Sequence, residues 1–223
     1  MRKDASLRER KKARTRQAIV QAAMKLFAAR GFDGTTVDDI AAAAEVSRRT
    51  FFRYFATKEI VMFPHQTLYL QRFRKLLAER RDGESPFEAL RRVCLQMAGA
   101  YMRSRDEHLR QQRIIQHSRA LIARGNEMDT EWEMVIADAL IRRMGTGREA
   151  QRRAHLMAGA LMGAIRATLQ EWYAGDCRQD LAELSQEMFA LLATGFAGRE
   201  FADQAPPTTT VKRPSVKRVP AST

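Results

Sequence analysis

The sequence contains few of the residues that define several common protein classes. Two of its 223 residues are cysteines, Cys94 and Cys177, which cannot form a disulfide framework and do not have the spacing of metal ligands. We expect both to be small apolar residues inside the fold. No apolar run approaches the ~20 residues that a membrane-spanning helix needs, and the basic start of the chain lacks the apolar segment of a signal peptide. The sequence therefore predicts a soluble, cytoplasmic protein that contacts no membrane and binds no metal.

Catalytic motifs are also absent from the sequence. The four histidines, at positions 65, 108, 117 and 155, do not form HExxH or another metal-binding pattern. The chain has no nucleophile elbow and no glycine-rich loop that would hold a phosphate. We therefore predict a protein that is not an enzyme and uses no cofactor.

Positive charge, in contrast, is abundant. Lysine and arginine number 39 against 26 aspartate and glutamate residues, which gives a formal net charge of +13. Such an excess favours nucleic acid or other anionic partners. Residues 1–15 predict a disordered basic arm, which either reaches DNA as homeodomain arms do or remains a solvated leader. Residues 201–223, rich in proline and threonine, predict a disordered basic tail.

Glycine and proline are scarce, and where they occur they indicate joints between helices. Elsewhere apolar residues recur with helical spacing, and no stretch alternates for long enough to be a strand. We therefore predict an all-α fold of about nine helices. One helix is expected around Ile19–Phe27, ended by Gly31. The others are expected at Val37–Ala44, Arg48–Phe55, Lys58–Arg81 with a kink at Pro64, Pro86–Arg103, Arg105–Arg124, Glu127–Met144, Arg148–Ala174 and Asp180–Phe196.

Two short helices in residues 35–58 have the pattern of a helix-turn-helix. Thr36 and Ser47 are good N-cap residues, and Glu45-Val46 is a tight break between the two helices. Helices this short need a third helix to pack on. The helix expected around Ile19–Phe27 provides an apolar face for this packing. In such a unit the second short helix enters the major groove of DNA.

The residues of the second short helix suit DNA recognition. Arg48 and Arg49 lie at its N-terminus, where an arginine can pair with guanine through two hydrogen bonds. Helix starts such as Ser47 also direct backbone N–H groups at phosphates. Hydroxyl and cationic groups suited to phosphate oxygens follow at Thr50, Arg53, Tyr54 and Lys58.

The run Val46-Ser47-Arg48-Arg49-Thr50-Phe51-Phe52-Arg53-Tyr54-Phe55, followed by Lys58-Glu59, resembles the DNA-binding domain of the tetracycline-repressor (TetR) family. The resemblance implies a helix-turn-helix domain over residues 16–60 and a helical ligand-binding and dimerisation domain over residues 61–200. It also implies a homodimer that a small molecule releases from a palindromic operator on double-stranded DNA. In the family pattern Thr36, Thr50, Tyr54 and Lys58 contact phosphates, whereas Arg48, Arg49 and Phe52 face bases.

The sequence departs from the family pattern at two positions. Glu45 stands where glycine is common, which predicts a slightly strained turn. Phe52 stands where tyrosine is common, so a hydroxyl contact would be missing.

The last two expected helices are candidates for the dimer interface. Their apolar faces carry small residues that permit close approach. The resemblance implies an isologous four-helix interface, although the periodicity alone shows only amphipathic helices. The candidate interface residues are Leu156, Ala160, Leu161, Ala164, Leu184, Met188 and Leu191.

The helices between the two ends could hold a ligand. The candidate lining residues are apolar or aromatic, while two basic side chains could pair with an anionic head group. The alternative is that the former are ordinary core residues and the latter a solvated face. Residues 105–143 resemble a TetR subgroup with an acyl-CoA-like ligand-binding domain, which implies a fatty-acyl or other lipophilic effector. The candidates are Met97, Tyr101, Trp132 and Ile136 for the lining, and Arg113 and His117 for the head group.

Three questions about function stay open at this point. The chain could be a DNA-binding dimer without an effector, or a non-specific binder held by charge, whose affinity would fall steeply with salt. It could also be an activator instead of a repressor. If a ligand does act, a bend at Pro64 could set the separation of the two recognition helices, which must match one turn of DNA, ~34–36 Å.

Overall fold

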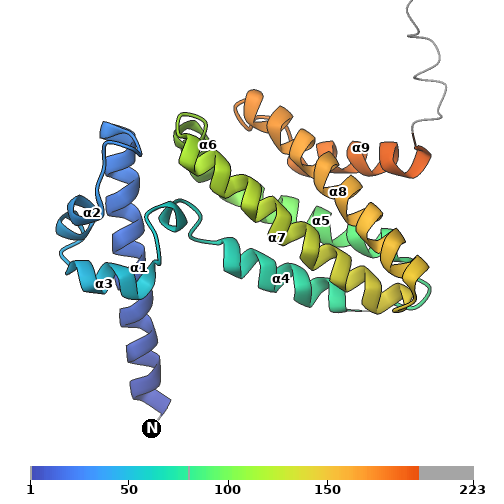
Figure 1. Cartoon of the computed structure of the whole chain (residues 1–223), viewed down its shortest axis with the longest axis horizontal. Helices are drawn as coiled ribbons and strands as arrows, with labels where there is room; N and C mark the ends of the chain where they lie inside the picture. Colours follow the sequence, from blue (N-terminus) through green and yellow to red (C-terminus); the bar gives the residue numbers. More distant parts are fainter. Residues whose placement is uncertain (1, 80, 196–223) are drawn as a thin grey trace, which may run out of the picture.

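The computed structural model describes residues 2–79 and 81–195, and every regular element within those ranges is a helix (Figure 1). This confirms the expected all-α fold. The elements are α1 (Arg2–Arg30), α2 (Val37–Ala43), α3 (Arg48–Tyr54), the 3-10 helix η1 (Glu59–Met62), α4 (Gln66–Ala78), α5 (Pro86–Arg103), α6 (Arg105–Ile115), α7 (Arg119–Met144), α8 (Arg148–Ala174) and α9 (Leu181–Thr194).

The N-terminal domain consists of α1, α2, α3 and η1. The two short helices lie against the C-terminal half of α1 (Figure 1). Their shared core contains residues of the predicted helical stripe, together with Phe51 of α3 and Phe55 directly after it. Ile19, Phe27, Ile40, Phe51 and Phe55 are all buried there.

Helix boundaries in this domain follow the caps. The Thr36 side chain accepts a hydrogen bond from the Asp39 backbone, and the Asp39 carboxylate accepts one from the Thr36 backbone, so the two form a capping box. Ser47 caps α3 by accepting from the Thr50 backbone. Between the helices Glu45 has a φ of +53°, which confirms that a side chain stands where the turn favours glycine.

The expected disorder of residues 1–15 is wrong for the part that is described, because α1 begins at Arg2. Arginine, lysine, glutamate and alanine all have high helix propensity. A helix already nucleated by its packed half can therefore extend through this basic segment at little cost. The expected tail over residues 201–223 lies outside the described residues.

The expected kinked helix over Lys58–Arg81 is also wrong. The chain forms η1, leaves helical geometry at Phe63–His65, and begins α4 at Gln66. Proline lacks the N–H that a continuing helix needs, and it disfavours helical geometry in the residue before it. Phe63 accordingly has φ −120° and ψ 56°. We call Phe63–Gln66 the joint, because it connects the two domains.

The C-terminal domain comprises α4 to α9. Helices α7 and α8 pack along each other, and α5 lies behind them in the view of Figure 1. The bounds expected for α5 and α8 are confirmed exactly as Pro86–Arg103 and Arg148–Ala174. Ser85 caps α5 with a capping box, and Pro86 occupies its first position.

The break expected at Gly125-Asn126 is wrong, because α7 runs through it and the chain instead breaks at residues 116–118. One glycine costs a helix only ~1 kcal/mol. Arg124 bonds both Glu127 and Glu131 across that position, which stabilises the turn. Leu121, upstream of the glycine, is buried in the core of the N-terminal domain and fixes the start of α7.

No helix among the described residues is long and apolar enough to cross a membrane. Within the same residues, no cluster of His, Cys, Asp and Glu could hold a metal ion. Cys177 is buried and Cys94 partly so. Burial raises the pKa of the Cys94 thiol to about 12, so this cysteine serves as an apolar residue.

Candidate DNA interface and ligand cavity

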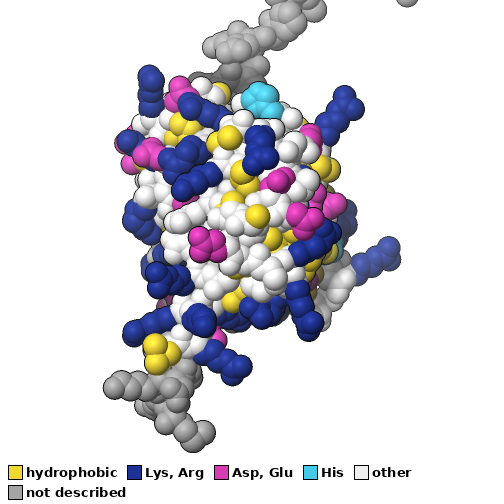
Figure 2. All heavy atoms as spheres, turned by 90° about the vertical axis from the view of Figure 1, so that its left-hand side faces the viewer, with side chains coloured by type: hydrophobic (Ala, Val, Ile, Leu, Met, Phe, Trp, Pro, Cys, Tyr) yellow, Lys and Arg dark blue, Asp and Glu magenta, His cyan; other side chains and the backbone are white. Residues whose placement is uncertain are grey.

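Helix α3 presents most of its predicted DNA-binding residues to solvent. Arg48, Arg49, Phe52 and Arg53 are exposed, whereas Tyr54 is half-buried. Figure 2 shows lysine and arginine side chains spread across this side of the molecule, with acidic side chains among them. The exposed side chains come from one short helix whose buried residue, Phe51, fixes the helix on the domain core.

Arg48 and Arg49 differ in their surroundings. The Arg48 guanidinium donates to the Asp38 carboxylate at 2.7 Å and lies 5.5 Å from the centre of the Phe52 ring. Both members of this ion pair are well exposed, so it is weak and can open on contact with DNA. Arg49 is exposed and has no ion pair with any described residue. Of the two arginines, Arg49 is therefore the one that needs to break no ion pair with a described residue before it meets a partner.

Two of the predicted phosphate-contacting residues, Thr36 and Ser47, already use their hydroxyls to cap helices. Thr36 Oγ1 donates to the Asp39 carboxylate at 2.7 Å, and Ser47 Oγ lies 2.9 Å from Thr50 Oγ1. Hydrogen bonds from Thr36 lower the pKa of Asp39. These contacts hold the starts of α2 and α3 in place, with the backbone N–H groups of both helix ends on the exposed side.

Lys58, predicted as a phosphate contact, has a different position from the one expected. Its ammonium donates to the carbonyls of Phe32 and Thr35, both at 2.8 Å, and lies 4.0 Å from the centre of the Phe32 ring. Lys58 therefore fixes the loop before α2 onto the end of α3. Sequence reasoning missed this role because the partners lie 23 and 26 residues away.

Arg16 is a second residue that sequence reasoning missed. It belongs to α1, yet its Nη2 donates to the carbonyl of Pro64 at 2.8 Å, and its guanidinium lies 4.8 Å from the centre of the Phe55 ring. Partial burial lowers the pKa of Arg16. The arginine ties α1 directly to the joint.

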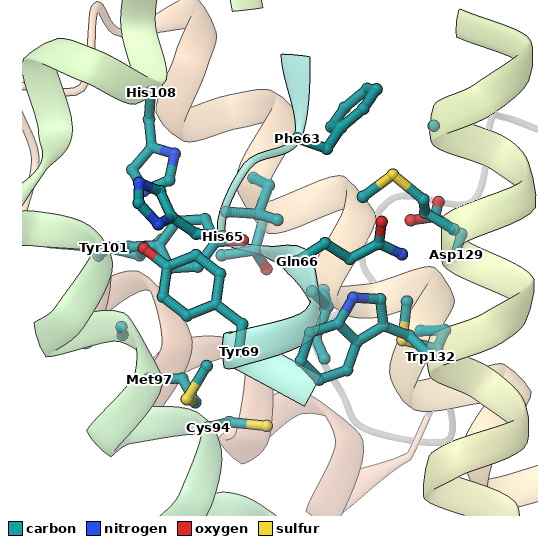
Figure 3. A pocket seen from close by; sticks show the side chains of 18 of the residues that line it. Phe63, His65, Gln66, Tyr69, Cys94, Met97, Tyr101, His108, Asp129 and Trp132 are labelled. Atoms are coloured by element: carbon teal, nitrogen blue, oxygen red, sulfur yellow. The ribbon is translucent and has the colours of Figure 1, made fainter. Parts of the chain in front are cut away.

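A cavity of about 290 Å³ lies in the C-terminal domain next to the joint. Met97, Tyr101, Trp132 and Ile136, the four predicted lining residues, all contribute to its wall. Figure 3 shows Tyr101 and Met97 on one side of the cavity and Trp132 on the other, with the Gln66 side chain between them. The joint residues Phe63, Pro64, His65 and Gln66 also line it.

Arg113 and His117, predicted to bind an anionic head group, do not line the cavity. Arg113 Nη2 contacts the Asp176 carboxylate at 3.2 Å, and His117 Nδ1 lies 2.6 Å from the Arg113 carbonyl oxygen. Both side chains are exposed. Arg113 lies on an exposed face of α6, which ends at Ile115, and His117 lies in the exposed turn that follows.

The cavity wall on the side of α5 and α6 is a group of stacked rings. The His108 and Tyr101 rings stack with centroids 4.2 Å apart and planes within 7° of parallel. Tyr69 lies 5.3 Å from Tyr101. Burial lowers the pKa of His108, which keeps the imidazole neutral.

The opposite wall carries the one carboxylate among the lining residues, Asp129. Burial raises the pKa of Asp129, while Arg166 at 3.8 Å opposes that shift. None of the described lining residues is lysine or arginine. The cavity is therefore apolar and aromatic, with a few polar groups and no cationic side chain.

The predicted dimer residues divide into two groups. Leu156, Ala160 and Leu191 are exposed on α8 and α9, with Leu156 65% and Leu191 51% exposed, and Ala164 is half-buried. The prediction is wrong for the others, because α8 and α9 also pack on the rest of their own domain and use one face for its core. The residues buried in that core are Leu161, Leu184 and Met188.

Comparisons with known proteins match both domains. The sequence model of bacterial regulatory proteins of the tetR family matches residues 19–62, and that of the MftR C-terminal domain matches residues 84–197. The transcriptional regulator TcmR of Streptomyces glaucescens is 31% identical over 173 residues, 75% of this chain and 76% of TcmR. MftR of Mycobacterium tuberculosis, named for mycofactocin biosynthesis, is 30% identical over 163 residues, 73% of this chain and 82% of MftR.

Among solved structures, FadR of Thermus thermophilus is similar over 93% of this chain and 99% of its own. Its identity is 28% and its TM-score 0.53. That protein is described as a TetR-family transcriptional repressor in complex with lauroyl-CoA.

Proposed function

The chain belongs to the TetR family of bacterial regulatory proteins and is a DNA-binding transcriptional regulator, and we propose that it is a ligand-released repressor. In this proposal a homodimer occupies a palindromic operator, and a small molecule in the cavity of each C-terminal domain causes its release. The observation that carries the proposal is that the cavity and the N-terminal domain share a wall, the joint.

The joint gives a ligand a direct mechanical connection to α1. Pro64 is buried, lines the cavity, and uses its carbonyl to bind Arg16 of α1. Gln66 donates to the Glu131 carboxylate of α7 at 2.7 Å, so the far end of the joint is fixed to the C-terminal domain. A molecule that displaces Phe63 or Pro64 would therefore shift α1 relative to α7. That movement replaces the kink expected at Pro64 as the way to change the separation of the recognition helices.

A second connection runs through the end of α6. Ile115 lines the cavity and also packs against the core of the N-terminal domain. Ser118, in the turn after α6, donates to the Asp33 carboxylate at 3.4 Å. A ligand shifts an equilibrium only by its differential affinity for two conformations. If the ligand binds one conformation more tightly than the other, these two connections would carry that preference from the cavity to the N-terminal domain.

The DNA contacts in this proposal come from α3 and the helix starts. Arg49, Arg48 and Phe52 face bases, with Arg48 leaving Asp38 on binding. Thr36, Ser47, Thr50, Arg53 and Tyr54 contact phosphates, and Lys58 holds the loop that presents Thr36. Exposed basic residues of α1, among them Arg8, Lys11 and Arg14, add phosphate contacts, so neutralising each would flatten the dependence of log K on log salt by ~0.9.

The dimer in this proposal forms through the exposed faces of α8 and α9. Leu156 and Leu191 are large apolar side chains that no described part of their own chain covers, and Ala160 and Ala164 allow close approach between helices. Two such pairs related by a two-fold axis would bury them in a four-helix interface.

A lipophilic effector suits the cavity. Its volume is near the lower end of the ~300–1,000 Å³ that is common for ligand sites, and its lining is mostly apolar and aromatic. A fatty-acyl chain is one such effector, and the complex of T. thermophilus FadR with lauroyl-CoA supports it as a candidate. Because no cationic side chain lines the cavity, the phosphates of a coenzyme A group would have to remain outside it.

Selection of random duplex DNA by the purified protein at near-physiological salt tests the proposal. The expected result is a palindrome whose half-sites lie about one helical turn apart, ~34–36 Å. A matched protein with Arg48→Ala and Arg49→Ala should recover no motif. If the native protein also recovers none, and salt abolishes its binding, charge alone holds the DNA and the proposal is wrong.

A further inference from the structure

His108 lies in the cavity wall with a ring nitrogen that has no partner. The side chain is 8% exposed, and its Nε2 atom forms no hydrogen bond with any described residue. Leaving a buried polar atom unpaired costs free energy, so such an atom in a native structure indicates a partner that binds there. Figure 3 shows the imidazole turned toward the interior of the cavity, beside Tyr101. Nε2 is therefore available to a molecule in the cavity.

The surroundings of His108 favour a flat, apolar molecule. Its ring is held parallel to Tyr101, and Tyr69 continues the same wall. Trp132 faces these rings from α7, with its indole 5.3 Å from Phe73 (Figure 3). Aromatic side chains on two sides of a cavity stack well on an aromatic ligand, and less well on a flexible chain.

The charged residues that line the cavity do not favour an anionic ligand. The lining contains Asp129 but neither lysine nor arginine. A carboxylate or phosphate inside the cavity would be a buried charge without a lysine or arginine to pair with in the lining, which is unfavourable. A neutral imidazole, in contrast, can donate or accept at Nε2 according to its tautomer, so it suits a neutral hydroxyl or carbonyl group.

We propose that the cavity binds an uncharged aromatic compound whose hydroxyl or carbonyl group forms a hydrogen bond with His108 Nε2. This inference names the class of effector for the proposed function, and it rests on that function only in treating the cavity as the effector site. His108 forms the hydrogen bond to the polar group of the compound, and the rings of Tyr69, Tyr101 and Trp132 stack on its aromatic rings.

Calorimetric titration of the full chain with three compounds of one shape tests the assignment. The compounds are 2-naphthol, naphthalene and 2-naphthoate. We expect 2-naphthol to bind about threefold to tenfold more tightly than naphthalene, the value of one net hydrogen bond. The 2-naphthoate anion should bind most weakly.

Three variants show whether His108 is responsible. His108→Phe retains a stacking ring without Nε2 and should abolish the preference for 2-naphthol over naphthalene. His108→Gln retains a polar group and should keep part of the preference for 2-naphthol over naphthalene. His155→Phe, at an exposed position of α8 outside the cavity lining, should keep all of it. The melting temperature of ligand-free His108→Phe should equal or exceed that of the native protein, because the unpaired atom is gone.

Four results would overturn the inference: no binding of 2-naphthol, equal binding of naphthalene, tightest binding of 2-naphthoate, or an unchanged preference in His108→Phe. Operator release is measured separately on the selected duplex. Binding through His108 without release would leave the inference intact and contradict the proposed function. If 2-naphthol releases the operator equally well from the native protein and from His108→Phe, the proposed function stands and the inference about His108 is wrong.

Discussion

The two domains of this chain differ in how completely their side chains are packed and hydrogen-bonded within the domain. In the N-terminal domain Phe51 and Phe55 are fully packed, Lys58 bonds two carbonyls, and Thr36 and Asp39 cap each other. The C-terminal domain instead encloses a cavity of about 290 Å³, and His108 Nε2 in its wall has no partner.

This difference indicates a division of labour between the domains. A domain that reads DNA must hold its recognition helix in one geometry, and the N-terminal domain has the local contacts to do so. A domain that responds to a ligand must have a second state within a few kcal/mol. The cavity and the unpaired His108 Nε2 in its wall are the features of the C-terminal domain on which the proposed ligand would act.

The largest expected effect tests the difference in packing. Phe51→Ala removes a ring that is 0% exposed and packs between Phe52 and Phe55, so it should lower the free energy of unfolding by about 3–5 kcal/mol. Met97→Ala, beside space that is already empty, should cost at most the lower end of the ~2–5 kcal/mol range for such changes. Denaturant unfolding of both variants measures this. Equal losses would mean that the two cores are packed alike.

The next effect concerns DNA reading. Arg49→Ala should lower affinity for the selected operator by about 1–3 kcal/mol and affinity for a scrambled duplex by much less, because a base contact carries sequence information. Fluorescence anisotropy with the two duplexes measures this. Arg91→Ala, an exposed arginine of α5, is the matched control and should change neither affinity. The same loss on both duplexes would show that Arg49 contacts only phosphate.

A smaller effect compares one cap in each domain. Ser47→Ala and Ser85→Ala each remove an N-cap and should lower the free energy of unfolding by about 1 kcal/mol. Only Ser47→Ala should also weaken operator binding at a temperature where both variants are folded, since it frees the start of α3. Equal operator affinity of the two variants would contradict the role given to that helix start.

The smallest effect concerns acid stability of the C-terminal domain. Glu84 bonds Arg92 at 2.6 Å and lies 3.7 Å from Arg143, and the hydrogen bond from Arg92 lowers the Glu84 pKa. A lowered pKa gives stability that is complete above the ordinary glutamate value of about 4.3 and is lost as pH falls through the lower folded value. Glu84→Gln should therefore flatten the fall in melting temperature below that pH. Glu149→Gln removes an ion pair exposed to solvent and should change it less.

Sequence reasoning predicted well the features that depend on nearby residues. Thr36 and Ser47 were identified as caps because each bonds a backbone N–H three residues away. Glu45 was expected to strain its turn for a similarly local reason. Four lining residues of the cavity were also identified, because large apolar residues on the inner face of a helix border whatever space the domain encloses.

The errors at individual site residues come from packing that nearby residues do not determine. Arg113 and His117 were assigned to a head group from composition, but Arg113 lies on an exposed face of α6 and His117 in the exposed turn after it. Leu161, Leu184 and Met188 have the same helical spacing as the exposed residues beside them, so periodicity could not separate core from surface. The contact of Arg16 with Pro64 spans 48 residues and left no local signal.

The central claim is that the cavity and the DNA-binding surface are coupled through the joint, and it can be tested without knowing the effector. Coupling is reciprocal, so operator DNA must change the cavity if a ligand in the cavity changes operator affinity. We would measure amide hydrogen exchange of the full chain with and without the selected operator. The account predicts altered protection in α3 and, in addition, at Gln66–Tyr69 and the end of α6, where the cavity meets the joint. Changes confined to the N-terminal domain would contradict it.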